Sequence, residues 1–299
     1  MIEVQDLKKN YNGVEALKGV TFCIKEGSFF ALLGPNGAGK STTVNIISTL
    51  LMQNTGKVTI DGSDTINESD LARKKIGVVF QHSTLDDSLT VEENLIFRAS
   101  LYGLSKTTIQ KRIDYLSELL DFKSYLSQRI KTLSGGQKRK IDVARALIFD
   151  PKYLILDEPT TGLDPSVRKQ IWTFVNTIRK TTQTTIILTT HYMEEVIDCD
   201  HVVIIDKGKV IAEDSAENLR KTYTKDFLKI TPKNDFSKVK FEKLPNAKSV
   251  NALIYLPIDN PFKGIDFVQT HQENIETFEI VKGSMDDVFL HLTGRELTP

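Results

Sequence analysis

The chain has 299 residues, of which 40% are hydrophobic and 26% are charged; this composition is typical of globular proteins and excludes wholesale disorder or a fibrous repeat. Lysine plus arginine number 39, as do aspartate plus glutamate, so the chain lacks the basic excess of a free nucleic-acid binder. The two cysteines are too few for a disulfide framework or a structural zinc site, and the apolar runs are far shorter than the roughly 20 residues that cross a bilayer.

The N-terminal part of the chain is predicted to be mostly strands. Residues 2–11 and 20–34 are rich in β-branched and aromatic side chains and are interrupted by glycine. Residues 29–33 form a continuous apolar run that ends at Gly34, which is typical of a strand buried on both faces. After a glycine-rich loop, apolar residues recur at helical spacing, and we predict a helix over residues 40–51.

A helical region is predicted between about residues 85 and 150. Thr90 and Glu93 have the spacing of a capping box, which marks the start of a helix. Farther along, four apolar residues fall on one face of a helix and indicate the side that is buried. These residues are Ile109, Ile113, Leu116 and Leu120.

Strand patterns return in the next part of the chain, at residues 152–156, 184–190 and 202–205. A helix separates the first two, and its start is marked by Asp164 and Pro165, because proline is tolerated in the first helical turn. Strands that alternate with helices predict a mostly parallel sheet with helices packed on it.

The C-terminal part has a weaker pattern. Residues 221–250 contain eight lysines and three acidic residues, which we interpret as a solvated surface, with a face toward membrane headgroups as the alternative. A strand over residues 277–281, a helix start at Ser284 and a helix stop at Gly294 are predicted at the end of the chain.

The most specific motif is a glycine-rich loop between a predicted strand and a predicted helix. It fits the pattern G-x-x-x-x-G-K-[ST] and consists of Gly34, Pro35, Asn36, Gly37, Ala38, Gly39, Lys40 and Ser41, followed by Thr42. Small residues let backbone N–H groups surround phosphate oxygens at a helix N-terminus. Lys40 is expected to reach the β- and γ-phosphates, and Ser41 to offer its hydroxyl to Mg²⁺. The alternative is a glycine-rich connection that binds nothing.

Two carboxylates follow the predicted strand over residues 152–156. Asp157 suits a magnesium ligand, either directly or through water. Glu158 is the next residue, so its side chain points elsewhere and can polarise a water molecule beside the γ-phosphate. Strands also end in acids without any function, and this prediction therefore depends on the phosphate loop upstream.

A second glycine-containing helix start lies at Leu133, Ser134, Gly135, Gly136 and Gln137. The serine and glutamine have capping-box spacing, and two glycines leave the backbone N–H groups bare for an anion. Because one nucleotide needs only one phosphate loop, this second anion site must serve something else, unless it is an ordinary glycine-rich cap.

The order of these motifs resembles the ATP-binding cassette family. The matching segments are GPNGAGKS, Gln81 in VVFQHS, LSGGQ, LILDEP, Gly162-Leu-Asp164, and His191 in TTHYMEE, and together they cover about residues 2–220. The resemblance implies an α/β fold in which a P-loop NTPase core with a mostly parallel sheet carries an antiparallel β subdomain and a helical subdomain over about residues 85–150. Residues 1–220 would form the ATPase domain and residues 221–299 a small α+β C-terminal extension.

In this family two cassettes pair head to tail, which would explain the second anion site. By resemblance, Ser134, Gly135 and Gly136 would grip the γ-phosphate that the partner's phosphate loop holds. Asp164 would order the dimer seam, and an N-cap role for it is compatible with that.

Three more residues take roles from the resemblance. Tyr11 would stack on adenine, with a core tyrosine as the alternative. Gln81 would contact Mg²⁺ or the attacking water, and His191 would hydrogen-bond the γ-phosphate and Glu158, with a packing histidine as the alternative. We interpret Cys23 and Cys199, which lie outside the motifs, as packing residues in a reduced, cytoplasmic setting.

The C-terminal residues 278–294 resemble the end of drug-export cassettes of the daunorubicin-resistance-like group. This implies an ATPase subunit, with ATP and Mg²⁺, that pairs with a second copy and binds a separate membrane permease at the cytoplasmic face of the membrane. Two alternatives stay open, an importer subunit and a soluble cassette ATPase that acts on ribosomes or DNA. The single phosphate loop, the lack of coiled-coil or zinc insertions and the neutral charge disfavour the second alternative and any nucleic-acid partner.

Overall fold

The computed structural model describes residues 1–250 and 252–294, so residues 251 and 295–299 of the predicted C-terminal domain lie outside the described residues. The chain divides into two compact units, Met1–Glu213 and Asp214–Pro299. The division lies after Glu213, whereas the sequence suggests a boundary near residue 220; that domain assignment stays a prediction.

A six-stranded sheet forms the centre of the first unit, with the strand order β10-β9-β3-β8-β7-β6. The strands β9, β3, β8, β7 and β6 pair in parallel, which confirms the mostly parallel sheet. Every residue of β3, β7 and β8 is buried, as expected for strands covered on both faces. The bounds are β3 (Phe29–Leu33), β6 (Ile76–Val79), β7 (Tyr153–Asp157), β8 (Thr185–Thr190), β9 (His201–Asp206) and β10 (Lys209–Asp214).

A second, antiparallel sheet has the order β2-β1-β4-β5 and shares a core with the central sheet. Its strands are β1 (Ile2–Tyr11), β2 (Val14–Ile24), β4 (Thr55–Ile60) and β5 (Ser63–Asp64). On β2, Phe22 and Ile24 point into this core, and Cys23 between them is exposed. The interpretation of Cys23 as a packing residue is therefore wrong, because side chains alternate between the two faces of a strand, whereas Cys199 is buried.

The helix after the glycine-rich loop is shorter than predicted. Helix α1 (Lys40–Ile47) ends with Ser48 as its C-cap, and the prediction of a helix up to residue 51 is wrong. Thr49 has a φ of 63°, in the left-handed region, so the helix cannot continue although the apolar spacing does. The short helix α2 (Ser69–Arg73) follows β5.

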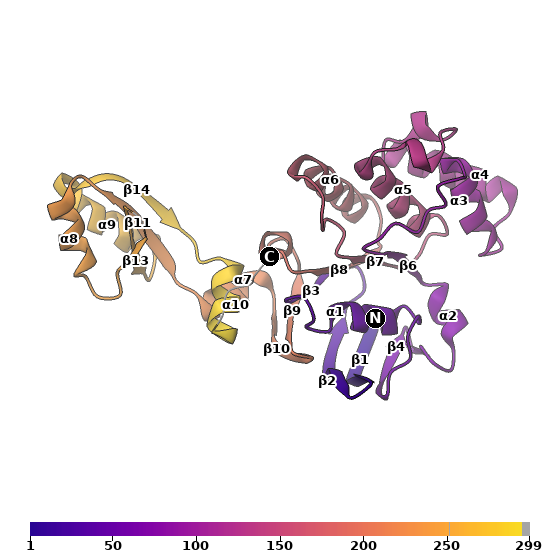
Figure 1. Ribbon diagram of the computed structural model, residues 1–299, viewed down its shortest axis with the longest axis horizontal. Coiled ribbons are helices and arrows are strands. Elements are labelled where there is room, and N and C mark those ends of the chain that lie inside the picture. The colour runs from indigo at the N-terminus through magenta and orange to yellow at the C-terminus, as the bar shows by residue number, and fades with distance from the viewer. Residues whose placement is uncertain (251, 295–299) are drawn as a thin grey trace. The chain divides into compact units, whose positions relative to one another are not determined.

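Helices occupy the middle of the chain, as the sequence predicts. They are α3 (Val91–Ser100), α4 (Lys106–Leu119), α5 (Gly135–Leu147) and α6 (Pro165–Thr181), with single 3₁₀ turns at Lys123–Tyr125, Ile130–Thr132 and Met193–Val196. Thr90 and Glu93 form the predicted capping box of α3, and the predicted apolar stripe along α4 is buried. Within the first unit these helices gather on one side of the central sheet, opposite α1 and the antiparallel strands (Figure 1).

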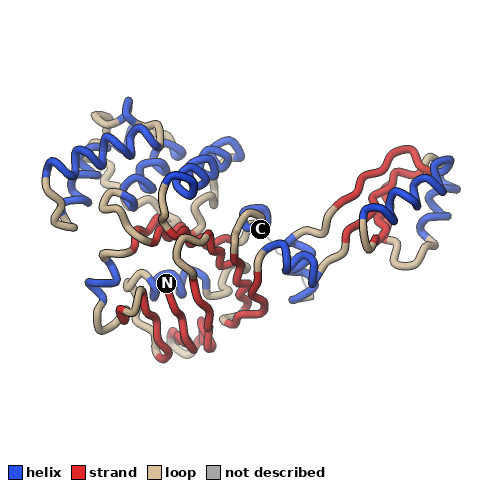
Figure 2. Tube along the Cα trace, turned by 180° about the vertical axis from the view of Figure 1, so that it is seen from behind, coloured by secondary structure: helices blue, strands red, loops and turns tan. Residues whose placement is uncertain are grey.

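The second unit is a small α+β structure with an antiparallel sheet of order β12-β13-β11-β14. Helices α8 and α9 pack on this sheet (Figure 2). The rings of Phe241 and Phe267 are 6.0 Å apart. Ser284 and Asp287 form a capping box, and Gly294 ends the last helix in the left-handed conformation, which confirms both predicted helix signals. The elements are α7 (Ala216–Tyr223), β11 (Asp226–Pro232), α8 (Asp235–Glu242), β12 (Lys248–Val250), β13 (Leu253–Ile258), α9 (Pro261–His271), β14 (Ile275–Val281) and α10 (Met285–Thr293).

Within residues 1–250 and 252–294, no helix is both long enough and apolar enough to cross a bilayer.

Candidate functional site

The glycine-rich loop connects β3 to α1, the strand–loop–helix context that the motif requires. Gly37 and Gly39 have φ values of 78° and 111°, which favour glycine. A Cβ at Gly34 would lie 2.2 Å from the carbonyl oxygen of Ile205, and one at Gly39 would lie 2.6 Å from a methyl group of Leu17. The local fold therefore needs small residues here, and the open loop leads directly into the N-terminus of α1.

Lys40 is the first residue of α1, and only 3% of it is exposed. Its ammonium donates to the carbonyl oxygens of Gly34 at 2.8 Å and Pro35 at 3.1 Å, and its Nζ lies 3.1 Å from Glu158 Oε1. Burial lowers the pKa of the Lys40 ammonium, although Glu158 and Asp157 oppose this shift. The Lys40 ammonium thus lies against its own loop, bound by the carbonyl oxygens of Gly34 and Pro35 and by the Glu158 carboxylate.

Asp157 is the last residue of β7, and Glu158 is the first residue after the strand. Its Oδ1 accepts a hydrogen bond from the Thr189 hydroxyl and lies 3.4 Å from Ser41 Oγ. Burial raises the pKa of Asp157 and the charge of Glu158 adds to the shift, whereas the Thr189 hydroxyl opposes it. The sheet therefore brings a carboxylate from β7 next to the hydroxyl that opens α1.

Glu158 has a φ of 45°, a left-handed conformation that costs a non-glycine residue roughly 1–2 kcal/mol. Its backbone N–H donates to the Thr189 carbonyl oxygen at 3.1 Å, which holds this turn beside β8. The reversal directs the two neighbouring carboxylates to different partners, Asp157 toward Ser41 and Glu158 toward Lys40.

The second oxygen of the Glu158 carboxylate has two neighbours. Thr161 Oγ1 donates to Oε2 at 3.1 Å, and His191 Nδ1 lies 3.5 Å from the same oxygen. Burial alone would raise the pKa of Glu158, but Lys40 and His191 outweigh it, so its pKa lies below the ordinary value. The carboxylate is therefore ionised at neutral pH. Lys40, Glu158 and His191, to which the sequence analysis gives separate roles, thus lie in one cluster.

The second glycine-containing motif forms the N-terminus of α5, and the predicted capping box is confirmed. Ser134 N donates to Gln137 Oε1 at 2.8 Å, and Ser134 Oγ accepts from Gln137 N at 3.3 Å. Ser134 and Gly135 are exposed, whereas Leu133 and Gly136 are buried, with Gly136 against Val167 of α6. Within the described part of this chain, no hydrogen bond or ion pair joins this helix start to its own phosphate loop.

The other predicted residues come from the end of β1, the segment after β6 and the start of α6. Tyr11 ends β1 with 42% of its surface exposed and Lys9 Nζ 5.3 Å from its ring centre, so the alternative of a core tyrosine is wrong. Gln81 is exposed beyond the end of β6. Asp164 accepts from Ser166 N at 3.0 Å and Val167 N at 3.1 Å, which confirms it as the N-cap of α6.

Several known proteins are similar to this chain over most of its length. The daunorubicin/doxorubicin resistance ATP-binding protein of Streptomyces peucetius is 35% identical over 98% of this chain and 92% of its own length. A Nod factor export ATP-binding protein I of Rhizobium sp. (strain N33) is 41% identical over 73% of this chain and 72% of its own. Residues 17–161 match the family model described as ABC transporter. The chain belongs to the ABC transporter family.

A solved ABC structure extends this likeness to three dimensions. A dimeric ATP-binding cassette in a post-hydrolysis state, bound to ADP and phosphate, is 29% identical with a TM-score of 0.64. The match covers 72% of this chain and 98% of the cassette. As an ABC ATP-binding subunit, the chain binds nucleotide and hydrolyses ATP, and the P-loop NTPase fold is confirmed.

Glu195, the last residue of the matching segment TTHYMEE, has no role assigned from the sequence. Glu195 is 6% exposed, and its carboxylate accepts hydrogen bonds from the hydroxyls of Thr160 and, at 2.6 Å, Thr190. In the sequence it stands beside Glu194 and four residues after His191, and nothing there separates a buried acid from a solvated one. Only the tertiary contacts distinguish it.

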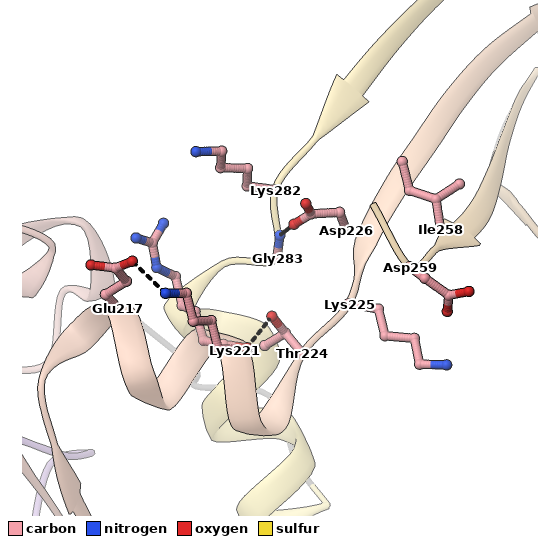
Figure 3. Close-up of a pocket in the computed structure, with 10 residues that line it drawn as sticks. Glu217, Lys221, Thr224, Lys225, Asp226, Ile258, Asp259, Lys282 and Gly283 are labelled. Carbon is pink, nitrogen blue, oxygen red and sulfur yellow. Dashed lines mark hydrogen bonds and ion pairs between the residues drawn. The ribbon is translucent and has the colours of Figure 1, made fainter. Parts of the chain in front are cut away.

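The second unit contains a cavity of about 660 Å³, lined by residues from α7, β11, β13 and the end of β14 (Figure 3). Lys221 Nζ lies 2.6 Å from Glu217 Oε1, and the backbone N–H of Gly283 donates to Asp226 at 3.3 Å. Cations and anions both line the walls and partly neutralise one another, so the lining does not select a ligand of one charge.

Proposed function

We propose that the chain is the ATP-hydrolysing subunit of an exporter, and that it pairs head to tail with a second copy and drives a substrate through a separate membrane permease. Its place would be peripheral, at the cytoplasmic face of the membrane. The names of two relatives, a drug resistance ATP-binding protein and an export ATP-binding protein, support the exporter assignment. The observation that carries the ATPase role is the position of the Glu158 carboxylate, 3.1 Å from Lys40 Nζ and 3.5 Å from His191 Nδ1 beside the phosphate loop.

The loop that joins β3 to α1 binds ATP. Backbone N–H groups of residues 34–41 and the N-terminus of α1 bind phosphate oxygens, and Thr42 continues this surface. Lys40 supplies the cation for the β- and γ-phosphates and exchanges its carbonyl partners for phosphate oxygens. The exposed ring of Tyr11 is available to stack on the adenine.

Two oxygen donors fit a magnesium ion beside this loop. The Ser41 hydroxyl and the Asp157 carboxylate lie 3.4 Å apart, and Mg²⁺ is usually held by one or two protein oxygens together with water and substrate phosphates. We assign these two residues as ligands and Gln81 as a third that contacts the ion or the attacking water. When bound, the ion neutralises charge on the phosphate oxygens.

Glu158 acts as the general base. Its ionised carboxylate orients a water molecule and accepts a proton as the water oxygen bonds to the γ-phosphorus and the bond to the β-phosphate oxygen breaks. Thr161 holds the carboxylate through a hydrogen bond to Oε2, and His191 Nδ1 lies 3.5 Å from the same oxygen without a hydrogen bond to it. We assign the other ring nitrogen of His191 to the γ-phosphate.

The second copy completes each site. Ser134 and Gly135 are exposed at the start of α5, where helix N–H groups attract anions, and they have no hydrogen bond to their own loop among the described residues. They would therefore grip the γ-phosphate of the partner, with Leu133, Gly136 and Gln137 holding their geometry. Asp164, exposed at the start of α6, would lie at the seam.

Glu158→Gln tests the hydrolytic role. The amide keeps the size of the side chain but cannot accept the proton, so phosphate release should fall by about a hundredfold or more while ATP still binds. Glu118→Gln, an exposed acid on α4, is the matched control and should keep normal turnover. A Glu158→Gln chain with near-normal phosphate release contradicts this role.

The pairing of two copies is tested in the same background. Glu158→Gln chains should form an ATP-dependent dimer in size-exclusion chromatography, and adding Ser134→Arg should abolish that dimer without changing ATP binding. Ser105→Arg removes a similar N-cap, that of α4, and controls for lost capping. A dimer that persists with Ser134→Arg rules out the proposed use of α5.

A further inference from the structure

Glu195 joins two segments of the chain that the sequence keeps apart. One of its carboxylate oxygens, Oε1, accepts from the hydroxyl of Thr160, and the other, Oε2, accepts from the hydroxyl of Thr190 at 2.6 Å. The Thr190 hydroxyl also accepts from the backbone N–H of Tyr192 at 2.9 Å, which fixes the turn after β8. Both threonines are almost completely buried, so these bonds are shielded from water.

Each of these two segments also carries a residue that lies beside Glu158 Oε2. Thr161, the residue after Thr160, donates to Glu158 Oε2 at 3.1 Å. His191, the residue after Thr190, has its Nδ1 3.5 Å from that oxygen. The two oxygens of Glu195 thus bind Thr160 and Thr190, and the residue that follows each of these threonines lies beside Glu158 Oε2.

Stability alone gives a weak reason for an acid at this position. Burial raises the pKa of Glu195, and the hydrogen bonds from Thr160 and Thr190 only oppose that shift. A buried carboxylate is costly to desolvate, whereas apolar side chains of similar size can fill such a space without that cost. What an acid adds is two acceptor oxygens in a fixed relation, which can set the spacing of two hydroxyl groups.

We propose that Glu195 is a positioning residue for ATP hydrolysis, which holds Thr160 and Thr190 together and thereby sets the placement of Thr161 and His191 around Glu158. This inference rests on the proposed role of Glu158 as general base. Glu195 itself contacts neither the phosphate loop nor Glu158 among the described residues.

The test compares Glu195→Ala with Glu194→Ala in the full-length chain. Glu194 is the neighbouring acid, 63% exposed, and its nearest cation is Arg168 at 3.6 Å. Glu195→Ala should lower kcat by about tenfold to a hundredfold with KM for ATP changed by less than about twofold, because the phosphate loop and Lys40, which provide most of the contacts to ATP, are untouched. Glu194→Ala should leave both constants near those of the parent chain.

Two further measurements separate positioning from a merely structural role. Glu195→Gln keeps one acceptor oxygen and the shape of the side chain, so its kcat should lie between those of the parent and Glu195→Ala, and it replaces the alanine variant if that one fails to fold. In a Glu158→Gln background, measured by single-turnover hydrolysis, Glu195→Ala should cause little additional loss, because a residue that acts through Glu158 has nothing left to position.

Three results would overturn the inference. They are a folded Glu195→Ala chain with kcat like that of Glu194→Ala, a Glu195→Gln chain with fully normal kcat, and a loss that is fully additive with Glu158→Gln. If Glu158→Gln alone keeps normal turnover, the proposed role of Glu158 as general base is wrong, and the positioning role of Glu195 falls with it. If Glu158→Gln is inactive and the Glu195 variants are normal, only the positioning role fails.

Discussion

The two compact units differ in whether their charged side chains are buried. The first unit buries Lys40, Asp157 and Glu158, of which 3%, 5% and 8% are exposed. In the second unit, among residues 214–250 and 252–294, Ser237 is the only buried polar or charged side chain. Its charged residues pair near the surface instead, as Lys229 does with Glu279 at 2.9 Å.

This difference indicates where the chemistry lies. Burying charges is costly unless they are paired and hydrogen-bonded, and the first unit meets that condition with Lys40 and Glu158 at 3.1 Å. The second unit rests on an aliphatic and aromatic core around Phe241. We therefore expect substitutions of charges to abolish activity in the first unit and to have small effects in the second.

The largest expected effect is that of Lys40→Ala. The variant removes the cation that serves the phosphates and leaves Glu158 without its closest charge partner. ATP binding should weaken by about tenfold to a hundredfold, since a hydrogen bond to a charged group contributes about 1.5–3 kcal/mol, and hydrolysis should be lost. Nucleotide titration and phosphate release measure these effects. Lys57→Ala, on the exposed part of β4, is the control. Unchanged ATP affinity in Lys40→Ala would contradict the claim that the buried charges of the first unit bind the nucleotide.

Phe241→Ala should have the next largest effect, on the stability of the second unit. Phe241 is fully buried on α8, with its ring 6.0 Å from Phe267 and 5.9 Å from His271. Truncation of such a residue costs about 3–5 kcal/mol. Denaturant unfolding should show this loss, while ATP binding by the first unit persists. Phe262→Ala, which removes a 77% exposed ring from the same unit, should change little. Equal effects of the two variants would contradict a core centred on Phe241.

The smallest effect is expected for Lys229→Ala. This lysine links β11 to β14 through Glu279, and both side chains are partly exposed to solvent. Exposed ion pairs contribute about 0–1 kcal/mol, so unfolding free energy should change by less than about 1 kcal/mol and ATP hydrolysis should stay normal. A loss as large as that of Phe241→Ala would show that surface charge, not the apolar core, holds this unit together.

Local structure was predictable from the sequence wherever neighbouring residues decide it. The predicted helix starts at Thr90, Ser134 and Ser284 are all present, and each has a capping box, which depends on hydrogen bonds between residues three positions apart. The phosphate loop could be predicted from its glycines and its lysine. The structure requires the glycines because Ile205 closely approaches Gly34, and because Gly37 and Gly39 have positive φ angles. The parallel sheet follows from the alternation of strands and helices.

Local apolar spacing did not show that Thr49 adopts a left-handed conformation, and the alternation of side chains along β2 puts Cys23 on the solvent face. Other features were decided by contacts between residues far apart in the chain. The two bonds of Glu195, to Thr160 and Thr190, exist only because the fold brings the segment after β7 beside the end of β8. The sequence by itself determined which chemical groups are present and which short-range bonds they form. Only the tertiary structure decided which of them are buried together, because burial and long-range pairing depend on the packing of the whole unit.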